Sequence, residues 1–163
     1  MSGSGSFGVN YKRTFDATTV PSLPAKIGDF GSCPEGGFLF VQADGAIAQY
    51  AFVKISDDGQ AVELTTTNAG SNNLQVGVAQ VAAADNEYLW VWVGGVGGGG
   101  VGTGIKGKAA ASYAAKANLY TTATAGVADD ATGTTKIAYV VGLETLTGAG
   151  TVTLFSVAHL KVN

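Results

Sequence analysis

The glycine-rich stretch that follows Trp92 has the spacing of two nucleotide-binding motifs. Gly97-x-Gly99-x-x-Gly102 matches a dinucleotide fingerprint, and residues 102–108 follow the Walker A pattern up to its last position. A P-loop needs Ser or Thr after its lysine to bind Mg²⁺, and a helix whose amino end holds phosphate. Ala109 stands at the position of that hydroxyl, so the sequence predicts a loop that crosses a crowded surface and binds no cofactor.

Nucleophilic catalysis would have to use the single cysteine, Cys33, or the single histidine, His159. One cysteine forms neither an intrachain disulfide nor a cysteine-based zinc site. A lone histidine in the strand-like segment at the C-terminal end is typical of an edge-strand or interface residue. The sequence therefore predicts no catalytic pair.

Adjacent carboxylates occur at Asp57–Asp58 and at Asp129–Asp130, both near glycine. Such pairs are typical of solvated turns, and tight calcium binding needs three or more spaced oxygen ligands. We therefore expect no metal site, and a protein that is not an enzyme.

The composition of the chain limits the kinds of partner it can bind. The 163 residues carry a net charge of -3, only 13% are charged, and the nine basic residues are scattered without a cluster that could neutralise phosphates. This argues against direct binding of nucleic acid. No apolar run reaches the ~18 residues of a membrane span, and no secretory signal is recognisable, so we expect a protein that is not in a membrane and that is made in a cytoplasm.

The element that organises the chain is the run 89–93, Leu-Trp-Val-Trp-Val. It has the length and composition of a core strand, with Trp90 and Trp92 as its anchors. Around it, turn signals every 8–12 residues separate short β-runs, which predicts an all-β fold with little helix, a sandwich or a barrel. The alanine-rich stretch after Lys108 is expected to be a loop with at most one helical turn.

Two halves of the chain are similar in their order of strands and glycine turns. Residues 36–95 and 108–158 each run from strand to glycine turn, Val-Gly strand and closing strand, and the loop 94–107 joins them. Gly59 and Gly126 stand at nearly the same separation as Gly77 and Gly142. We therefore expect a duplicated unit, or a barrel built twice, within a β domain that spans 31–163.

Residues 1–30 differ from the rest, because they are rich in Gly and Ser and contain Pro21 and Pro24. Two interpretations stay open: a frayed terminus, or an extended arm that docks on another surface. The candidate interface residues of such an arm are Phe7, Tyr11, Lys12, Arg13 and Phe15.

The motif order over residues 76–158 resembles that of the small capsid decoration (cement) proteins of tailed bacteriophages. The resemblance is carried by Leu119-Tyr120 with Gly126, by Val141-Gly142-Leu143-Glu144, and by the hairpin around Gly148 and Gly150. The strand 89–95 is similar to the family's Val-x-Val-x-Gly strand. The chain departs from the family in lacking Ala before Leu143 and in its long 94–107 insertion.

This resemblance implies a compact β-barrel or β-tulip domain, commonly a homotrimer, on the outer capsid surface of the virion, assembled in the host cytoplasm. There it would bridge neighbouring subunits of the major capsid protein and so stabilise the head. The alternative is a receptor- or glycan-binding β module of a phage fibre or tail. That function needs exposed aromatic rings, and Trp90 and Trp92, on one face of a strand, are the candidates.

Overall fold

The computed structural model describes residues 9–18, 22–70, 75–95 and 104–162, and it confirms the all-β prediction, because no helix occurs in these ranges. The strands are β1 (Thr14–Phe15), β2 (Phe30–Cys33), β3 (Gly36–Ala43), β4 (Phe52–Ile55), β5 (Gln60–Glu63), β6 (Gln75–Ala79), β7 (Tyr88–Gly94), β8 (Lys106–Ala109), β9 (Asn118–Thr121), β10 (Ala128–Asp129), β11 (Lys136–Gly142) and β12 (Gly150–Val162).

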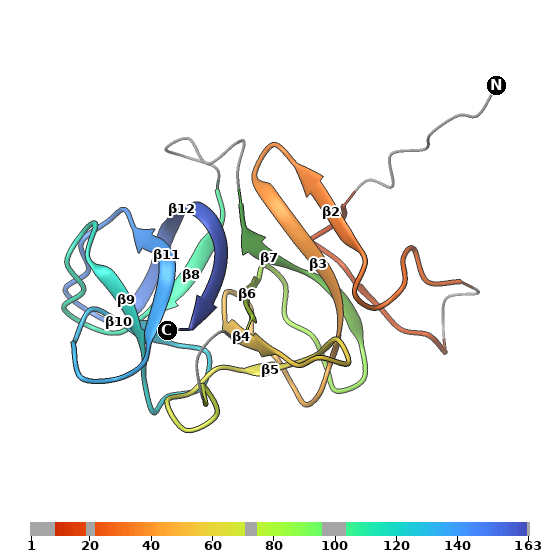
Figure 1. The fold of residues 1–163 in the computed structure, drawn as a ribbon, viewed down its shortest axis with the longest axis horizontal. Coiled ribbons are helices and arrows are strands. Elements are labelled where there is room, and N and C mark those ends of the chain that lie inside the picture. Colours follow the sequence, from red (N-terminus) through yellow and green to blue (C-terminus); the bar gives the residue numbers. More distant parts are fainter. Residues whose placement is uncertain (1–8, 19–21, 71–74, 96–103, 163) are drawn as a thin grey trace.

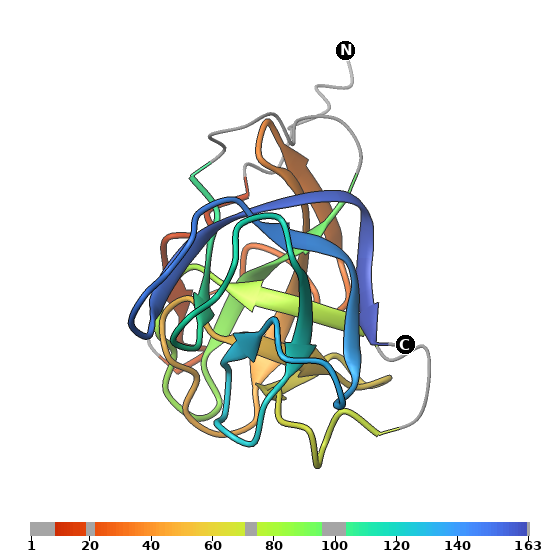
Figure 2. The same cartoon turned by 90° about the vertical axis from the view of Figure 1, so that its left-hand side faces the viewer.

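The strands close into two rings that lie side by side along the long axis of the molecule (Figure 1). In the first ring β3 pairs with β5, β5 with β4, β4 with β6, β6 with β7, and β7 again with β3. In the second, β8 pairs with β10, β10 with β9, β9 with β11, β11 with β12, and β12 again with β8. Figure 2 looks onto the end that the second ring occupies.

The two rings have the same strand order, and in each the one parallel pairing includes two buried alanines. Ala43 pairs with Ala61 in the first ring, and Ala109 with Ala128 in the second. The next residue then donates its N–H to the second alanine's carbonyl, Asp44 to Ala61 and Ala110 to Ala128, at 2.9 Å in both.

Backbone details between these strands repeat as well. Tyr50 and Lys116 both have φ = +64°, and their N–H groups donate to Ala79 and Gly142 respectively, at 2.8 Å. A carboxylate at the end of β5, or just after β10, caps the corresponding loop: Glu63 accepts from the Ala48 N–H at 2.7 Å, and Asp130 from the Ala114 N–H at 2.8 Å. Non-glycine residues at positive φ are uncommon, so their recurrence at matched positions identifies a tandem repeat.

The turn glycines of the sequence comparison fall on this repeat. Gly59 and Gly126 lie in the β4–β5 and β9–β10 turns, with φ of +80° and +71°. The alanine-rich stretch after Lys108 corresponds to the segment after Ala43 and forms turns with no helical turn, because its backbone follows the path of the first repeat. β12 runs on to Val162, beyond the predicted end of the second half at 158, because its last residues pair with β11 and with β6 of the first ring.

Strand β7 is buried on both faces, which explains its uninterrupted apolar sequence. Leu89, Val91 and Val93 belong to a core cluster made only of first-ring residues, the interior of that ring. Trp90 and Trp92 point the other way, beside Phe40 and Phe38 on the neighbouring strand. This outer aromatic face is continuous with the core of the second ring.

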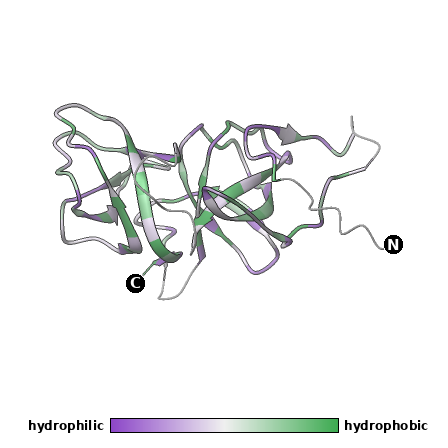
Figure 3. Ribbon diagram, turned by 90° about the horizontal axis from the view of Figure 1, so that it is seen from above, coloured by the Kyte–Doolittle hydropathy of each residue, from purple (hydrophilic) through white to green (hydrophobic). Residues whose placement is uncertain are grey.

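The rings are joined by the crossing of β12 from the second ring to the first. His159 pairs with Gly94 of β7, and Lys161 pairs with Gln75 of β6. A Cβ at Gly94, where φ is +77°, would lie 2.6 Å from the carbonyl oxygen of Ala158, so only glycine fits this close approach. Seen from above, hydrophobic segments occur along the strands of both rings (Figure 3).

Tyr113 is fully buried in the second ring and gives the first testable prediction. Its hydroxyl donates to the Ala117 carbonyl and accepts from the Gly142 N–H, both at 2.7 Å. We expect Tyr113→Phe to lower the free energy of unfolding by about 1–3 kcal/mol, because it leaves the buried Gly142 N–H unpaired. Urea denaturation measures the change. The matched control Tyr139→Phe removes an exposed hydroxyl and should stay within about 0.5 kcal/mol of the parent; equal effects of the two substitutions would contradict the role of Tyr113.

Candidate functional site

The cysteine is held as a neutral thiol. Its Sγ donates to Oε2 of Glu35 at 2.9 Å, and burial, then this hydrogen bond to Glu35, raises the pKa of Cys33 to about 11. The histidine does not serve it as a base, since the His159 ring lies against Phe30 with ring centroids 5.5 Å apart. The two residues that could have formed a nucleophile and its base therefore take separate structural roles.

Glu35 connects three segments. Its carboxylate accepts a hydrogen bond from Cys33 and interacts with the Tyr11 hydroxyl. Both interactions hold the pKa of Glu35 below its usual value, and the hydrogen bond from Cys33 has the larger effect. Its carbonyl accepts from Nε1 of Trp92 at 2.9 Å. The β2–β3 turn is thereby tied both to the N-terminal segment and to β7.

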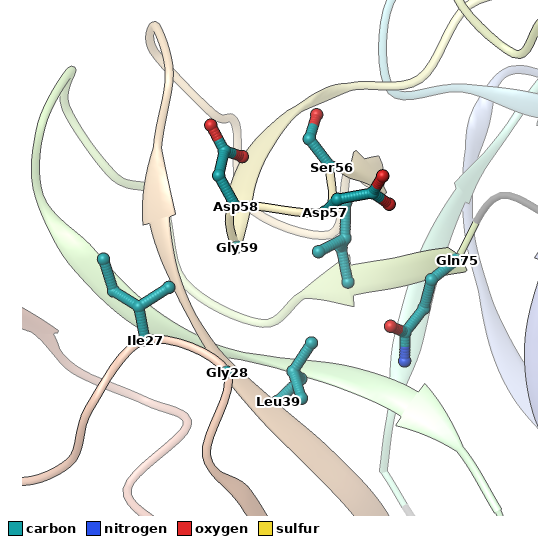
Figure 4. Close-up of a pocket in the computed structure, with 9 residues that line it drawn as sticks. Ile27, Gly28, Leu39, Ser56, Asp57, Asp58, Gly59 and Gln75 are labelled. Atoms are coloured by element: carbon teal, nitrogen blue, oxygen red, sulfur yellow. The ribbon is translucent and has the colours of Figure 1, made fainter.

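The acidic pairs cap turns. Asp58 accepts from the Gln60 N–H at 3.2 Å, and Asp130 accepts from Ala114. Asp57 and Asp58 line a pocket of about 400 Å³ with Ile27 and Leu39, but their carboxylates point in different directions (Figure 4). Among the described residues no group of three or more His, Cys, Asp or Glu side chains could hold a metal ion.

The apparent phosphate motifs lack their helix. Gly97, Gly99 and Gly102 lie outside the described residues, and residues 106–109 form strand β8. A strand offers no N-terminal dipole to a phosphate. In the ranges that the structure describes, no helix is long and apolar enough to cross a bilayer.

The described part of the N-terminal arm packs on its own chain, so Tyr11 and Phe15, two of the predicted interface residues, have partners within the molecule. Phe15 is only 8% exposed, because β1 pairs with β7 and the Phe15 ring lies 6.0 Å from Phe40. Tyr11 stacks on Phe38 at 4.8 Å. Lys12 lies over the Tyr11 ring at 5.7 Å and Arg13 over the Phe15 ring at 5.3 Å, and both are exposed. Phe7 lies outside the described residues.

The arm is therefore not separate from the 31–163 domain: in the described residues it covers the outer aromatic face of the first ring. The spacing of four between the aromatics did not reveal this, because the partner rings are supplied by strands far along the chain. Trp90 and Trp92, at 3% and 2% exposure, are core residues as the sequence predicts. They are thus not available for the stacking that a glycan would need.

A different set of side chains is exposed or partly exposed where β12 crosses between the rings. Val157, His159 and Lys161 alternate along β12 and so project to one side. Phe30 contacts His159, and Tyr139 lies under the Lys161 ammonium at 5.7 Å. We call these five residues the joint surface: Phe30, Tyr139, Val157, His159 and Lys161.

The joint surface contains three of the four large apolar side chains that are exposed among the described residues. Phe30 is 55% exposed, Val157 63% and Tyr139 47%. Tyr139 sits at φ = +69°, on a bulge of β11 opposite residues 157–160. Sequence reasoning found only His159, as an edge or interface residue, because apolar side chains in β-runs are ordinarily assigned to the core.

No protein-family model matches this chain, and no curated protein sequence or solved structure matches it either.

The reactivity of Cys33 tests whether its thiol is held neutral in the folded protein. With its pKa raised from 9.0 to about 11, the thiolate fraction at pH 8 is roughly 100-fold smaller than in the unfolded chain. We expect iodoacetamide to alkylate the folded protein at least tens of times more slowly than the urea-unfolded protein at the same pH, with mass spectrometry as the measurement. Comparable rates would show that Cys33 is an accessible, activated thiol.

Proposed function

We propose that this chain is a structural virion protein that binds the outer surface of an assembled phage capsid and bridges neighbouring subunits of the major capsid protein. Two independent observations support the proposal. The first is the resemblance of residues 76–158 to capsid decoration proteins. The second, which carries the proposal, is the joint surface: an apolar patch on a framework of closed rings.

The joint surface has the properties of a protein interface. Its exposed side chains include two aromatic rings and one aliphatic group, and its only permanent charge is that of Lys161. Aromatic residues at the centre of an interface contribute a disproportionate share of binding energy. Burial of each large apolar side chain contributes about 1.5–3 kcal/mol when it is complete. Because the patch lies on paired strands, little conformational entropy is lost when it binds.

A protein that binds only the assembled lattice stabilises that lattice by mass action. At a free concentration of 100 times Kd, each occupied site contributes about 2.7 kcal/mol. Association into a homotrimer, which the resemblance implies, would raise the effective concentration of the second and third contacts. No bond is made or broken in this mechanism, so it requires no catalytic residue and no cofactor.

The test is binding to undecorated, expanded shells of the virus that encodes the chain. We expect the purified protein to co-sediment with these shells and to raise their disruption temperature. Phe30→Ser combined with Val157→Ser should weaken binding roughly 100-fold, since each truncation removes about 1.4 kcal/mol of apolar contact.

The matched control is Ile27→Ser. Ile27 is an exposed aliphatic residue, at 39%, that lies outside the joint surface, and its substitution should leave shell binding within about threefold. A wild-type protein that does not bind shells would refute the proposal, and binding to a glycan array instead would favour the fibre or tail module. If both variants bind shells as the parent does, the joint surface is not the contact.

A further inference from the structure

Strand β2 has one paired edge and one open edge. It pairs with β3 over Phe30–Cys33, from Phe30 opposite Leu39 to Cys33 opposite Gly36. In the part of the chain that the structure describes, no strand pairs with its other edge. Every strand of the two rings, by contrast, has neighbours on both sides. Among the described residues, β2 and the two-residue strand β1, which pairs only with β7, are the strands with an unpaired edge, and β2 is the longer of the two.

The register shows which backbone groups face that open edge. The Phe40 N–H donates to the Asp29 carbonyl at 2.9 Å, so this pair is hydrogen-bonded. Hydrogen-bonded pairs alternate with non-bonded pairs in an antiparallel ladder. Gly31 and Cys33 therefore direct their backbone groups toward β3, whereas Phe30 and Ser32 direct theirs outward. The side chains of Phe30 and Ser32 are exposed as well.

A pocket of about 400 Å³ lies beside the N-terminal end of β2. It is lined by Phe30 and Gly31, by Trp90, and by residues of the preceding segment such as Leu23, Pro24 and Ala25. Most of this lining is apolar, and its volume lies at the lower end of the range of ligand pockets. An outward-facing strand edge and an apolar pocket are thus adjacent, which is the arrangement that adds a peptide strand to a sheet.

Trp90, one of the residues that line this pocket, also has a buried donor without a partner. Nε1 of Trp90 is buried and has no hydrogen-bond acceptor among the described residues, unlike Nε1 of Trp92. A buried donor without a partner is costly. The choice of a peptide over a purely apolar occupant such as a lipid chain rests on the open edge, because only a peptide brings backbone groups that can pair with those of Phe30 and Ser32.

We propose that the open edge of β2 takes up an extended segment of the partner protein, which adds as a strand beside Phe30–Cys33 and places one apolar side chain in the adjoining pocket. The inference rests on the proposed function for the identity of the partner, the shell protein. Backbone pairing supplies the orientation, and the pocket supplies side-chain selection.

The experiment compares Ser32→Pro with the matched control Ser32→Ala. Proline removes the outward N–H and is tolerated on an open edge, where that N–H has no internal partner. Alanine keeps the N–H. We expect Ser32→Ala to bind undecorated shells within about threefold of the wild type and Ser32→Pro to bind at least tenfold more weakly, with both variants sharing the wild-type denaturation midpoint.

Amide hydrogen exchange gives a second readout that does not depend on the proline variant. In the free protein the Gly31 and Cys33 amides should exchange slowly and the Phe30 and Ser32 amides rapidly. Shell binding followed by quenching, release and NMR should then show new protection of Phe30 and Ser32.

The outcomes separate the two proposals. Shell binding that leaves Phe30 and Ser32 exchanging rapidly, or that Ser32→Pro does not weaken, overturns the strand-addition inference alone. Failure of the wild type to bind shells overturns the proposed function, and with it this partner. Protection of the same amides at high protein concentration without shells would identify a second copy as the occupant, and would also overturn the inference.

Discussion

The structure depends on one packing constraint: β7 must bury both of its faces. Its aliphatic face fills the first ring, and its two tryptophans pair with Phe38 and Phe40 on the outside of that ring. Leaving this outer aromatic face in water would forgo about 25 cal/mol of stabilisation for each Å² of its apolar surface. The N-terminal segment and the second ring are the elements that cover it, so the order of the whole chain follows from this strand.

Covering that face determines which surface remains for partners. Tyr11 and Phe15 are used inside the molecule. Glu35 interacts with the Tyr11 hydroxyl of the N-terminal segment and is itself held by hydrogen bonds from Cys33 and Trp92. Three of the four large apolar side chains that remain exposed among the described residues lie on the joint surface.

Local pattern was enough to predict most of the strands, many of the turns and the tandem halves, because period-two apolar runs and Gly or Asp turns are encoded within a few residues of each other. It missed β2, and it assigned residues 106–109, which form β8, to loops. It could not predict the closure of each ring or the cover on Trp90, since these are pairings between distant segments such as β3 with β7 and β8 with β12. The exposure of Phe30 and Val157 was not predicted for the same reason. Their residue types predict burial, and only the geometry of the β12 crossing leaves them uncovered. Phe15 shows the opposite case, an aromatic in a polar terminal sequence that the tertiary fold buries.

The contribution of β12 to the first ring has a consequence for how the chain is made. Synthesis is vectorial, and β6 and β7 leave the ribosome long before residues 159–161, which pair with them. A nascent chain therefore carries an incompletely covered first ring until the final strand emerges, so its maturation is late and all-or-none. Translation products that lack residues 159–161 are accordingly expected to aggregate and to be degraded quickly.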